Sequence, residues 1–139
     1  MLVEEIMTVD PVTVTEETTI GDALSVMTEK GVRHLPVVRG AEVVGILSDR
    51  DFADIGASLL NGNKDFESLR AQLSQQVNSL MSGGVLTVDS DADLTEVTDL
   101  VVEEKLSALP VVESGSQRLV GIVSYVDLLR AARPLFENA

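Results

Sequence analysis

Two serine–aspartate pairs with the same spacing are the residues of this chain best suited to chemistry. Ser48 stands three residues before Asp51, and Ser124 three residues before Asp127, each serine lying where an apolar run ends and a helical pattern begins. A helix N-terminus exposes unpaired N–H groups and a partial positive charge, so it can hold a phosphate that a serine hydroxyl also bonds. An aspartate can accept hydrogen bonds from both hydroxyls of a ribose diol. The structural alternative is that each serine caps its helix and the aspartate completes a capping box.

Basic residues near the first pair support the phosphate interpretation. Arg33 and His34 precede the apolar run 35–38, and Arg50 lies inside the first pair. The 139-residue chain has 23 Asp+Glu against 10 Lys+Arg and a net charge of −13, so a bound anion needs a nearby cation. An arginine guanidinium suits phosphate well. Two alternatives stay open: His34, the only histidine, is a packing residue, and Arg50 is a solvated helix-surface residue.

Other chemistries fit the composition poorly. Ser48, His34 and Asp51 are the residue types of a hydrolase triad, but no nucleophile-elbow sequence surrounds the serine. The chain has no cysteine and one histidine, and its acidic stretch 89–93 lacks the loop length and terminal glutamate of an EF-hand. We therefore expect that the protein is not an enzyme and that it binds no metal.

Charge and hydropathy also limit the setting. The acidic surface disfavours nucleic acid and anionic membranes as partners. The N-terminus carries Glu4 and Glu5 where a signal peptide needs basic residues, and no apolar run reaches membrane-spanning length. The lack of cysteine fits a reducing compartment, so we expect a cytoplasmic protein.

The chain is one pattern written twice. Ile6-Met7-Thr8 recurs 74 residues later as Leu80-Met81-Ser82, and Leu35-Pro36-Val37-Val38 recurs at the same offset as Leu109-Pro110-Val111-Val112. Val44-Gly45-Ile46-Leu47-Ser48 recurs 76 residues later as Val120-Gly121-Ile122-Val123-Ser124. The two extra residues fall in the polar stretch 113–118, where a turn tolerates insertion.

Periodicity predicts the order strand, helix, strand, strand, helix in each copy. In the first copy we expect an extended piece at 12–14, a helix from the Thr19 cap to Gly31, a hairpin turn at 39–42 and a helix after Ser48. The second helix start carries Asp93 with Glu96, also as in a capping box. Neither copy is long enough to bury a core alone, so we expect the two to pack about a pseudo-twofold axis. The predicted fold class is thus α/β (α+β).

The segment between the copies is different. After a predicted loop at 61–64, an apolar stripe at helical spacing indicates a linker helix packed on the module; it comprises Phe66, Leu69, Leu73, Val77 and Leu80. The predicted organisation is a first repeat at 1–57, a linker helix region at 58–78 and a second repeat at 79–135.

These features resemble the tandem cystathionine-β-synthase (CBS) domain family over nearly the whole chain. The segments 45–51 and 121–127 match the family pattern Gly-h-x-Ser/Thr-x-x-Asp, where h is apolar. The opening 3–7, with 32–38 and 48–51, looks like the stand-alone acetoin-utilisation type. The resemblance implies two β-α-β-β-α repeats in one module, two clefts that bind adenosine compounds, and pairing of modules into a homodimer. Because the chain starts and ends near the pattern, no further domain is expected.

The resemblance also implies roles for particular residues. Ser48, Asp51, Ser124 and Asp127 would contact the ligand, Arg33 and His34 would face its phosphates, and Thr13 and Thr87 would lie near the cleft wall. The implied ligand is AMP, ADP or ATP, with S-adenosylmethionine ranked below them.

The second copy departs from this pattern. It has Ser107 and Ala108 at the positions of the basic pair, and Val126 at the position of Arg50. Its cleft therefore either binds weakly, binds a less charged adenosine compound, or stays empty. The resulting hypothesis is a nucleotide sensor that signals to a separate effector protein. The rival hypothesis is a ligand-independent dimerisation and interaction module.

Overall fold

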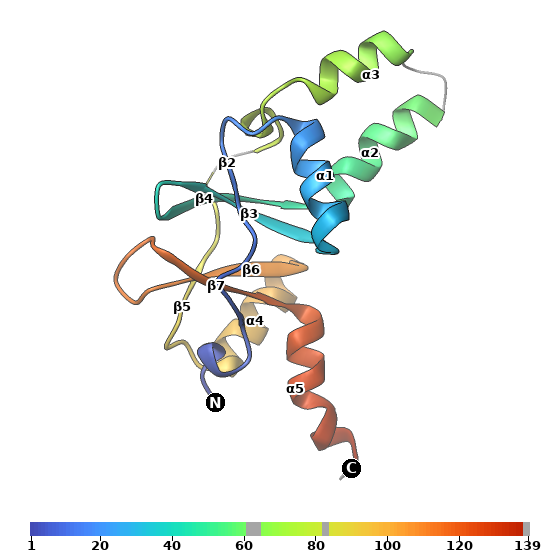
Figure 1. Cartoon of the computed structure of the whole chain (residues 1–139). Coiled ribbons are helices and arrows are strands. Elements are labelled where there is room, and N and C mark those ends of the chain that lie inside the picture. Colours follow the sequence, from blue (N-terminus) through green and yellow to red (C-terminus); the bar gives the residue numbers. More distant parts are fainter. Residues whose placement is uncertain (61–64, 82–83, 138–139) are drawn as a thin grey trace. The chain divides into compact units, whose positions relative to one another are not determined.

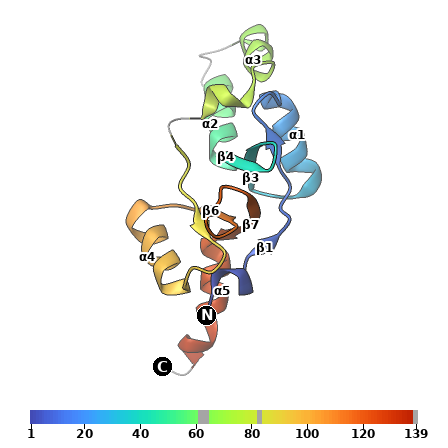
Figure 2. The same ribbon diagram turned by 90° about the vertical axis from the view of Figure 1, so that its left-hand side faces the viewer.

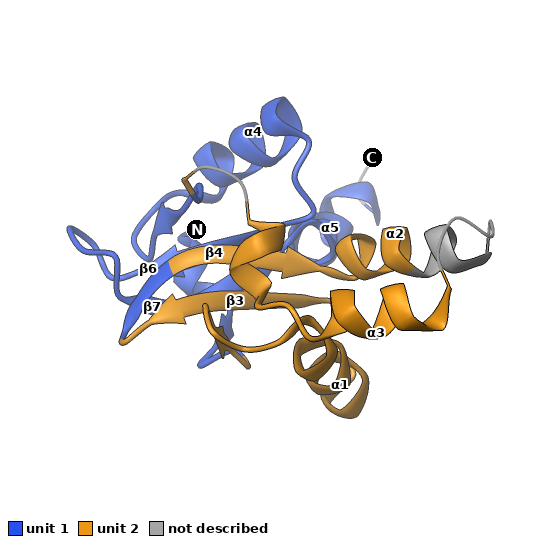
Figure 3. Cartoon of the chain, turned by 90° about the horizontal axis from the view of Figure 1, so that it is seen from above, with its two compact units in different colours: residues 1–11, 41–43, 85–139 blue, residues 12–40, 44–84 orange. Residues whose placement is uncertain are grey.

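The computed structural model describes residues 1–60, 65–81 and 84–137, with side chains left out at 56–60 (Figure 1). The loop predicted at 61–64 lies outside these residues. The chain divides into two compact units, coloured separately in Figure 3. Unit 1 comprises Met1–Pro11, Ala41–Val43 and Val85–Ala139, and unit 2 comprises Val12–Gly40 and Val44–Gly84.

The first copy has the predicted order of elements. Its elements are β2 (Val14–Thr15), α1 (Ile20–Lys30), β3 (His34–Arg39), β4 (Glu42–Ser48) and α2 (Asp49–Leu60). The strands form a sheet in the order β2-β3-β4, with β2 parallel to β3. The predicted hairpin turn is confirmed, because β3 ends at Arg39 and β4 begins at Glu42. Gly40 takes a φ of +62° in this turn, a conformation that favours glycine.

The second copy repeats that order and gains one strand. Its elements are β5 (Val88–Asp89), α4 (Leu94–Glu104), β6 (Ala108–Val112), β7 (Leu119–Ser124) and α5 (Tyr125–Glu137). The added strand β1 (Thr8–Val9) pairs antiparallel with β7, giving a sheet in the order β1-β7-β6-β5. Figure 2 shows β1 beside β7 in this unit.

Each unit contains its own apolar core, and the opening segment of the other copy completes it. In unit 2 the core residues of the first copy, such as Ile20 and Leu47, are joined by Val77, which stands 74 residues after Val3 and directly before the opening of the second copy. In unit 1 the core around Val111 and Val123 is joined by Val3 from the short 3-10 helix Val3–Glu5. Burying these side chains contributes roughly 1.5–3 kcal/mol each, so each copy depends on the other for part of its core.

The first helix of each copy is capped as its sequence predicts, with one difference. Thr19 accepts a hydrogen bond from the Asp22 N–H at the start of α1 (3.1 Å), and Gly31 ends that helix at a φ of +64°. Asp93 caps α4 but accepts from the N–H of Thr95 (2.9 Å) rather than from the expected position 96. Among the described residues, no helix has the length and apolar character that crossing a membrane requires.

The linker prediction is correct only in part. The helix α3 spans Phe66–Leu73 and ends there, and Phe66 is 76% exposed rather than packed on the module. The chain leaves the helix because residues 75–77 pair with the backbone before α1: the Ile20 N–H donates to the Gln75 carbonyl and the Val77 N–H to the Thr18 carbonyl (both 2.8 Å). The stripe therefore continues in a 3-10 helix, Val77–Leu80.

Candidate functional site

The first serine–aspartate pair lies at the junction of β4 and α2. The Ser48 N–H donates to Oδ2 of Asp51 at 2.8 Å, and the Ser48 hydroxyl lies 3.4 Å from the same oxygen. Both residues are half-buried. Within the described part of the chain, Oδ1 of Asp51 takes part in none of the hydrogen bonds found. The carboxylate thus closes the helix start with one oxygen and leaves the other able to accept a hydroxyl proton.

A backbone hydrogen bond brings the predicted cation to the same junction. The Asp49 N–H donates to the Arg33 carbonyl at 2.9 Å, so the residue before β3 lies beside the first turn of α2. The Arg33 side chain is exposed, His34 is half-buried as the first residue of β3, and Arg50 is exposed in the first turn of α2. The structure therefore places the backbone of Arg33 beside the helix start that follows the motif serine.

The second pair has the same backbone frame and tighter internal bonds. The Ser124 N–H donates to Oδ2 of Asp127 at 2.8 Å, and the Ser124 hydroxyl lies 3.0 Å from that oxygen. The Asp127 N–H also donates to the Ser124 hydroxyl at 3.2 Å, so this pair forms a complete capping box. The second pair therefore fits the capping interpretation better than the first. Among the hydrogen bonds of the described residues, none runs from the Asp51 N–H to the Ser48 hydroxyl.

The surroundings of the second pair lack the cations of the first. The Tyr125 N–H donates to the Ser107 carbonyl at 3.0 Å, matching the bond to Arg33 in the first copy. The side chain at that place is a serine, and the next residue, Ala108, is buried. Val126, at the position of Arg50, is 40% exposed. The second copy thus has uncharged side chains at the three positions that match Arg33, His34 and Arg50.

Arg130 is a candidate that the sequence analysis missed. Its Nη1 lies 3.7 Å from Oδ1 of Asp127, and its side chain is 74% exposed whereas that of Asp127 is 19% exposed. The spacing of three residues on one helix was the available signal, because such pairs face each other. The first copy has Asp54 at the matching position. The second oxygen of Asp127 is therefore next to an arginine, unlike that of Asp51.

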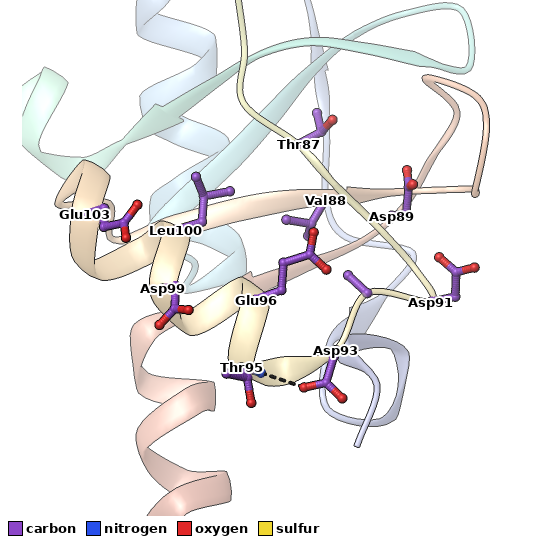
Figure 4. Close-up of a pocket in the computed structure, with 11 residues that line it drawn as sticks. Thr87, Val88, Asp89, Asp91, Asp93, Thr95, Glu96, Asp99, Leu100 and Glu103 are labelled. Atoms are coloured by element: carbon purple, nitrogen blue, oxygen red, sulfur yellow. Dashed lines mark hydrogen bonds between the residues drawn. The ribbon is translucent and has the colours of Figure 1, made fainter.

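The two threonines have different surroundings. Thr13 is exposed directly before β2. Thr87 is half-buried and lines a hollow of about 870 Å³ in unit 1, shown in Figure 4. Six carboxylates line this hollow from the segment around β5 and from α4, namely Asp89, Asp91, Asp93, Glu96, Asp99 and Glu103. This lining repels phosphate.

The acidic hollow has no metal-ligating arrangement. No group of three or more acidic or histidine side chains among the described residues is placed to hold a metal ion. Asp93 acts instead as the cap of α4. The hydrogen bond that it accepts from the Thr95 N–H lowers the pKa of its carboxyl, and the Met1 ammonium group lowers this pKa further. Its chemistry is therefore that of a helix N-terminus.

Comparison with known proteins gives a consistent family. The sequence pattern described as CBS domain matches residues 3–58 and 77–134. The uncharacterized protein MJ1225 of Methanocaldococcus jannaschii is 32% identical over 126 residues, which cover 86% of this chain and 45% of that protein. The chain thus spans about half the length, or less, of the first curated relatives it matches.

Solved structures resemble the chain over nearly its whole length. A proposed acetoin utilization protein (AcuB) from Vibrio cholerae has a TM-score of 0.79 and 30% identity, covering 99% of this chain and 95% of that one. CBSX2, solved in complex with AMP, has a TM-score of 0.77 and 28% identity, covering 96% and 97%. The CBS domain pair of MJ0100, solved with 5′-methylthioadenosine and S-adenosyl-L-methionine, has a TM-score of 0.78 and 26% identity, also covering 96% and 97%.

The two copies, their shared motif and their matching fold lead to the same assignment. Both copies are matched by the family pattern, and the solved relatives contain the same pair of repeats. The chain therefore belongs to the CBS domain family and contains a pair of CBS domains.

Proposed function

We propose that this CBS pair is a regulatory module that binds an adenine nucleotide and signals to a separate effector protein in the cytoplasm. Related pairs bind AMP in one case and methylthioadenosine with S-adenosyl-L-methionine in another, which supports an adenosine compound as the ligand. The proposal assigns binding and no catalysis to the chain. A bound ligand acts on a regulatory protein only through its differential affinity for two conformations.

One observation supports the proposal most: a helix start, the Asp51 carboxylate and the backbone of Arg33 lie at the β4–α2 junction. The helix start supplies N–H groups for a phosphate, and Arg33 lies beside it through the 2.9 Å bond from the Asp49 N–H. Asp51 keeps one carboxylate oxygen outside the hydrogen bonds of the described residues, and this oxygen would accept the ribose hydroxyls. Ser48, His34 and Arg50 complete the proposed phosphate contacts, with Thr13 in a supporting position. Thr87 belongs to unit 1, and we propose that it supports the second motif instead.

The second motif is proposed to bind a less charged adenosine compound. It keeps the serine, the aspartate and the backbone frame, but it has Ser107 and Val126 where the first copy has arginines. Arg130 partly neutralises Asp127 without placing a charge ahead of the strand. We therefore assign AMP, ADP or ATP to the first motif, and an adenosine compound with little or no phosphate charge to the second.

The test is calorimetric titration and thermal shift with AMP, ADP, ATP, methylthioadenosine and S-adenosylmethionine. Ligand at a hundredfold excess over its dissociation constant should stabilise the protein by about 2.7 kcal/mol. Asp51→Ala should abolish nucleotide binding. The matched control is Asp65→Ala, because Asp65 also accepts a hydrogen bond from a helix N–H, that of Ser68 at 2.8 Å. This control should leave nucleotide binding unchanged. Failure of every adenosine compound to stabilise the wild-type protein would contradict the proposal.

The second candidate function, a ligand-independent interaction and homodimerisation module, is favoured by helix α5. This 13-residue helix has no fully buried side chain, and Leu129, Leu135 and Phe136 are 56%, 71% and 67% exposed. Exposed apolar groups on one helix are typical of a docking surface. Sedimentation and partner-binding measurements on the double variant Asp51→Ala, Asp127→Ala distinguish the two functions. Assembly and partner binding equal to those of the wild-type protein would favour this candidate.

A further inference from the structure

A methionine covers the first residue of each ligand motif. A Cβ added to Gly45 would lie 2.5 Å from Cε and 3.0 Å from Sδ of Met81. A Cβ added to Gly121 would lie 2.5 Å from Sδ of Met7 and 2.9 Å from the Thr8 carbonyl oxygen. Each glycine is buried, and each methionine is half-buried. The space that a side chain would occupy at the start of each motif is therefore already filled by a thioether.

The methionines come from the opening segments, and they cross over between the copies. Met7 belongs to the opening of the first copy, yet it lies on Gly121 of the second motif, within unit 1. Met81 belongs to the opening of the second copy, yet it lies on Gly45 of the first motif, within unit 2. The repeated pairs Ile6-Met7 and Leu80-Met81, which the ligand chemistry leaves without a role, thereby acquire one.

These contacts lie close to the groups that define the helix start. Gly45 is three residues before Ser48 on the same strand, β4, and Gly121 is three residues before Ser124 on β7. In unit 1 the segment after Met7 is also hydrogen-bonded to β7 as strand β1, with Val9 opposite Gly121. In close-packed interiors, removal of a covering side chain lets the neighbouring backbone relax. A shift of either strand would move the serine N–H that donates a hydrogen bond to the motif aspartate.

We propose that Met81 is the positioning residue of the first ligand motif and Met7 that of the second. Each holds the strand that ends in the motif serine, so each copy's opening segment determines how well the other copy's motif is formed. As far as ligand affinity is concerned, the inference rests on the proposed function. The positioning of the two strands is independent of any ligand.

Hydrogen exchange on the full chain, without ligand, tests this positioning directly. In Met81→Ala the amides of 45–51 should exchange about tenfold faster or more, while those of 121–127 keep their protection. In Met7→Ala the effect should fall on 121–127 alone. The matched control is Met27→Ala, which truncates a buried methionine of α1 in unit 2 that covers neither glycine. Met81→Leu and Met7→Leu should restore protection, because leucine fills most of the space.

Calorimetric titration of AMP then links the positioning to the site. Met81→Ala should weaken AMP binding about tenfold, and Met7→Ala should leave it unchanged if the first motif holds AMP. Faster exchange of 45–51 in Met7→Ala, equal effects on both motifs, or effects no larger than those of Met27→Ala would each overturn the inference. If no adenosine compound binds the wild-type chain, the proposed function fails, but the exchange pattern still decides the positioning.

Discussion

The two copies have the same backbone junctions and differ in the side chains placed on them. Both have an N–H of the second helix bonded to the carbonyl before the middle strand, at 2.9 Å in the first copy and 3.0 Å in the second. Both have the serine N–H bonded to the aspartate at 2.8 Å. The frame is therefore a property of the repeated motif, whereas the charge around it belongs to each copy.

The two copies differ in the cations near the motif and in the hydrogen bonds of the motif aspartate. The first copy has Arg33 and Arg50 and leaves Oδ1 of Asp51 outside the hydrogen bonds of the described residues. The second copy has a complete capping box and an arginine beside Asp127. A duplicated motif can thus retain its structural role in both copies while the side chains around it differ. Four predictions break or sharpen this interpretation.

The largest difference is expected when the two motif glycines are replaced. Gly121→Ala should cost about 3 kcal/mol of unfolding free energy, because the added methyl meets the Thr8 carbonyl, a backbone atom that cannot swing away. Gly45→Ala should cost about 1 kcal/mol, because it meets only the flexible end of Met81. Urea denaturation measures both.

Second-site substitution provides the control for this pair. Met81→Ala should offset most of the cost of Gly45→Ala, whereas Met7→Ala should not offset that of Gly121→Ala, since the Thr8 carbonyl remains. If both glycine substitutions cost the same unfolding free energy, or if the methionine substitution offsets that cost in both copies, then the opening segments pack on the two motifs in the same way.

The next largest effect concerns the cation of the first copy. Arg33→Ala should weaken AMP binding about tenfold or more, the loss expected for one charge-assisted contact, and should leave adenosine binding unchanged. Arg70→Ala removes an equal charge from an exposed site on α3 in the same unit and is the matched control. Calorimetry that shows equal losses for AMP and adenosine would assign Arg33 a structural role instead.

Sequence reasoning was most successful where local chemistry decides the structure. The order of elements, the hairpin at Gly40 and the cap at Thr19 follow from short-range patterns, and the structure has all three. The linker was predicted less well, because backbone hydrogen bonds of 75–77 to residues 18–20 at the start of α1 override the helical spacing of Val77. Such long-range pairing leaves no local signature in the sequence.

The same limit applies to the candidate site. The motif alone predicted Ser48, Asp51 and their counterparts as candidates, and the structure bonds each serine to its aspartate. The sequence also showed that the second copy lacks the basic pair. The exchange of opening segments could not be predicted, because nothing in Ile6-Met7-Thr8 indicates which copy it joins. The pairing of Arg130 with Asp127 had a local signal in its spacing, but many such spacings produce no contact.

A smaller effect is expected at the ends of the first helices. Gly31 ends α1 and Lys105 ends α4, both in the left-handed region at φ values of +64° and +54°. A residue with a Cβ is strained there by roughly 1 kcal/mol, so Lys105→Gly should raise the unfolding free energy by about that amount and Gly31→Ala should lower it. Thermal denaturation that shows Lys105→Gly to be destabilising would mean that the lysine makes compensating interactions.

The smallest expected difference is a pH dependence of the cap on the first helix, expected in the second copy and not in the first. Thr19 caps α1 with a hydroxyl that does not titrate, whereas Asp93 caps α4 with a carboxylate whose pKa is lowered from its ordinary 3.8 by the Thr95 N–H. A lowered pKa in the folded state means that the cap stabilises fully above the unfolded value and is lost as pH falls below about 3.8. Asp93→Thr should therefore make the thermal midpoint fall less steeply in acid while changing it little at neutral pH.

The control must separate Asp93 from other acids, because the pKa values of Asp65 and Glu16 are also lowered. The informative quantity is the difference in thermal midpoint between variant and wild type, and Asp65→Thr provides the comparison from unit 2. If Asp93→Thr leaves the acid slope unchanged, the carboxylate cap of α4 contributes no pH dependence, and the two copies are equivalent at their helix starts.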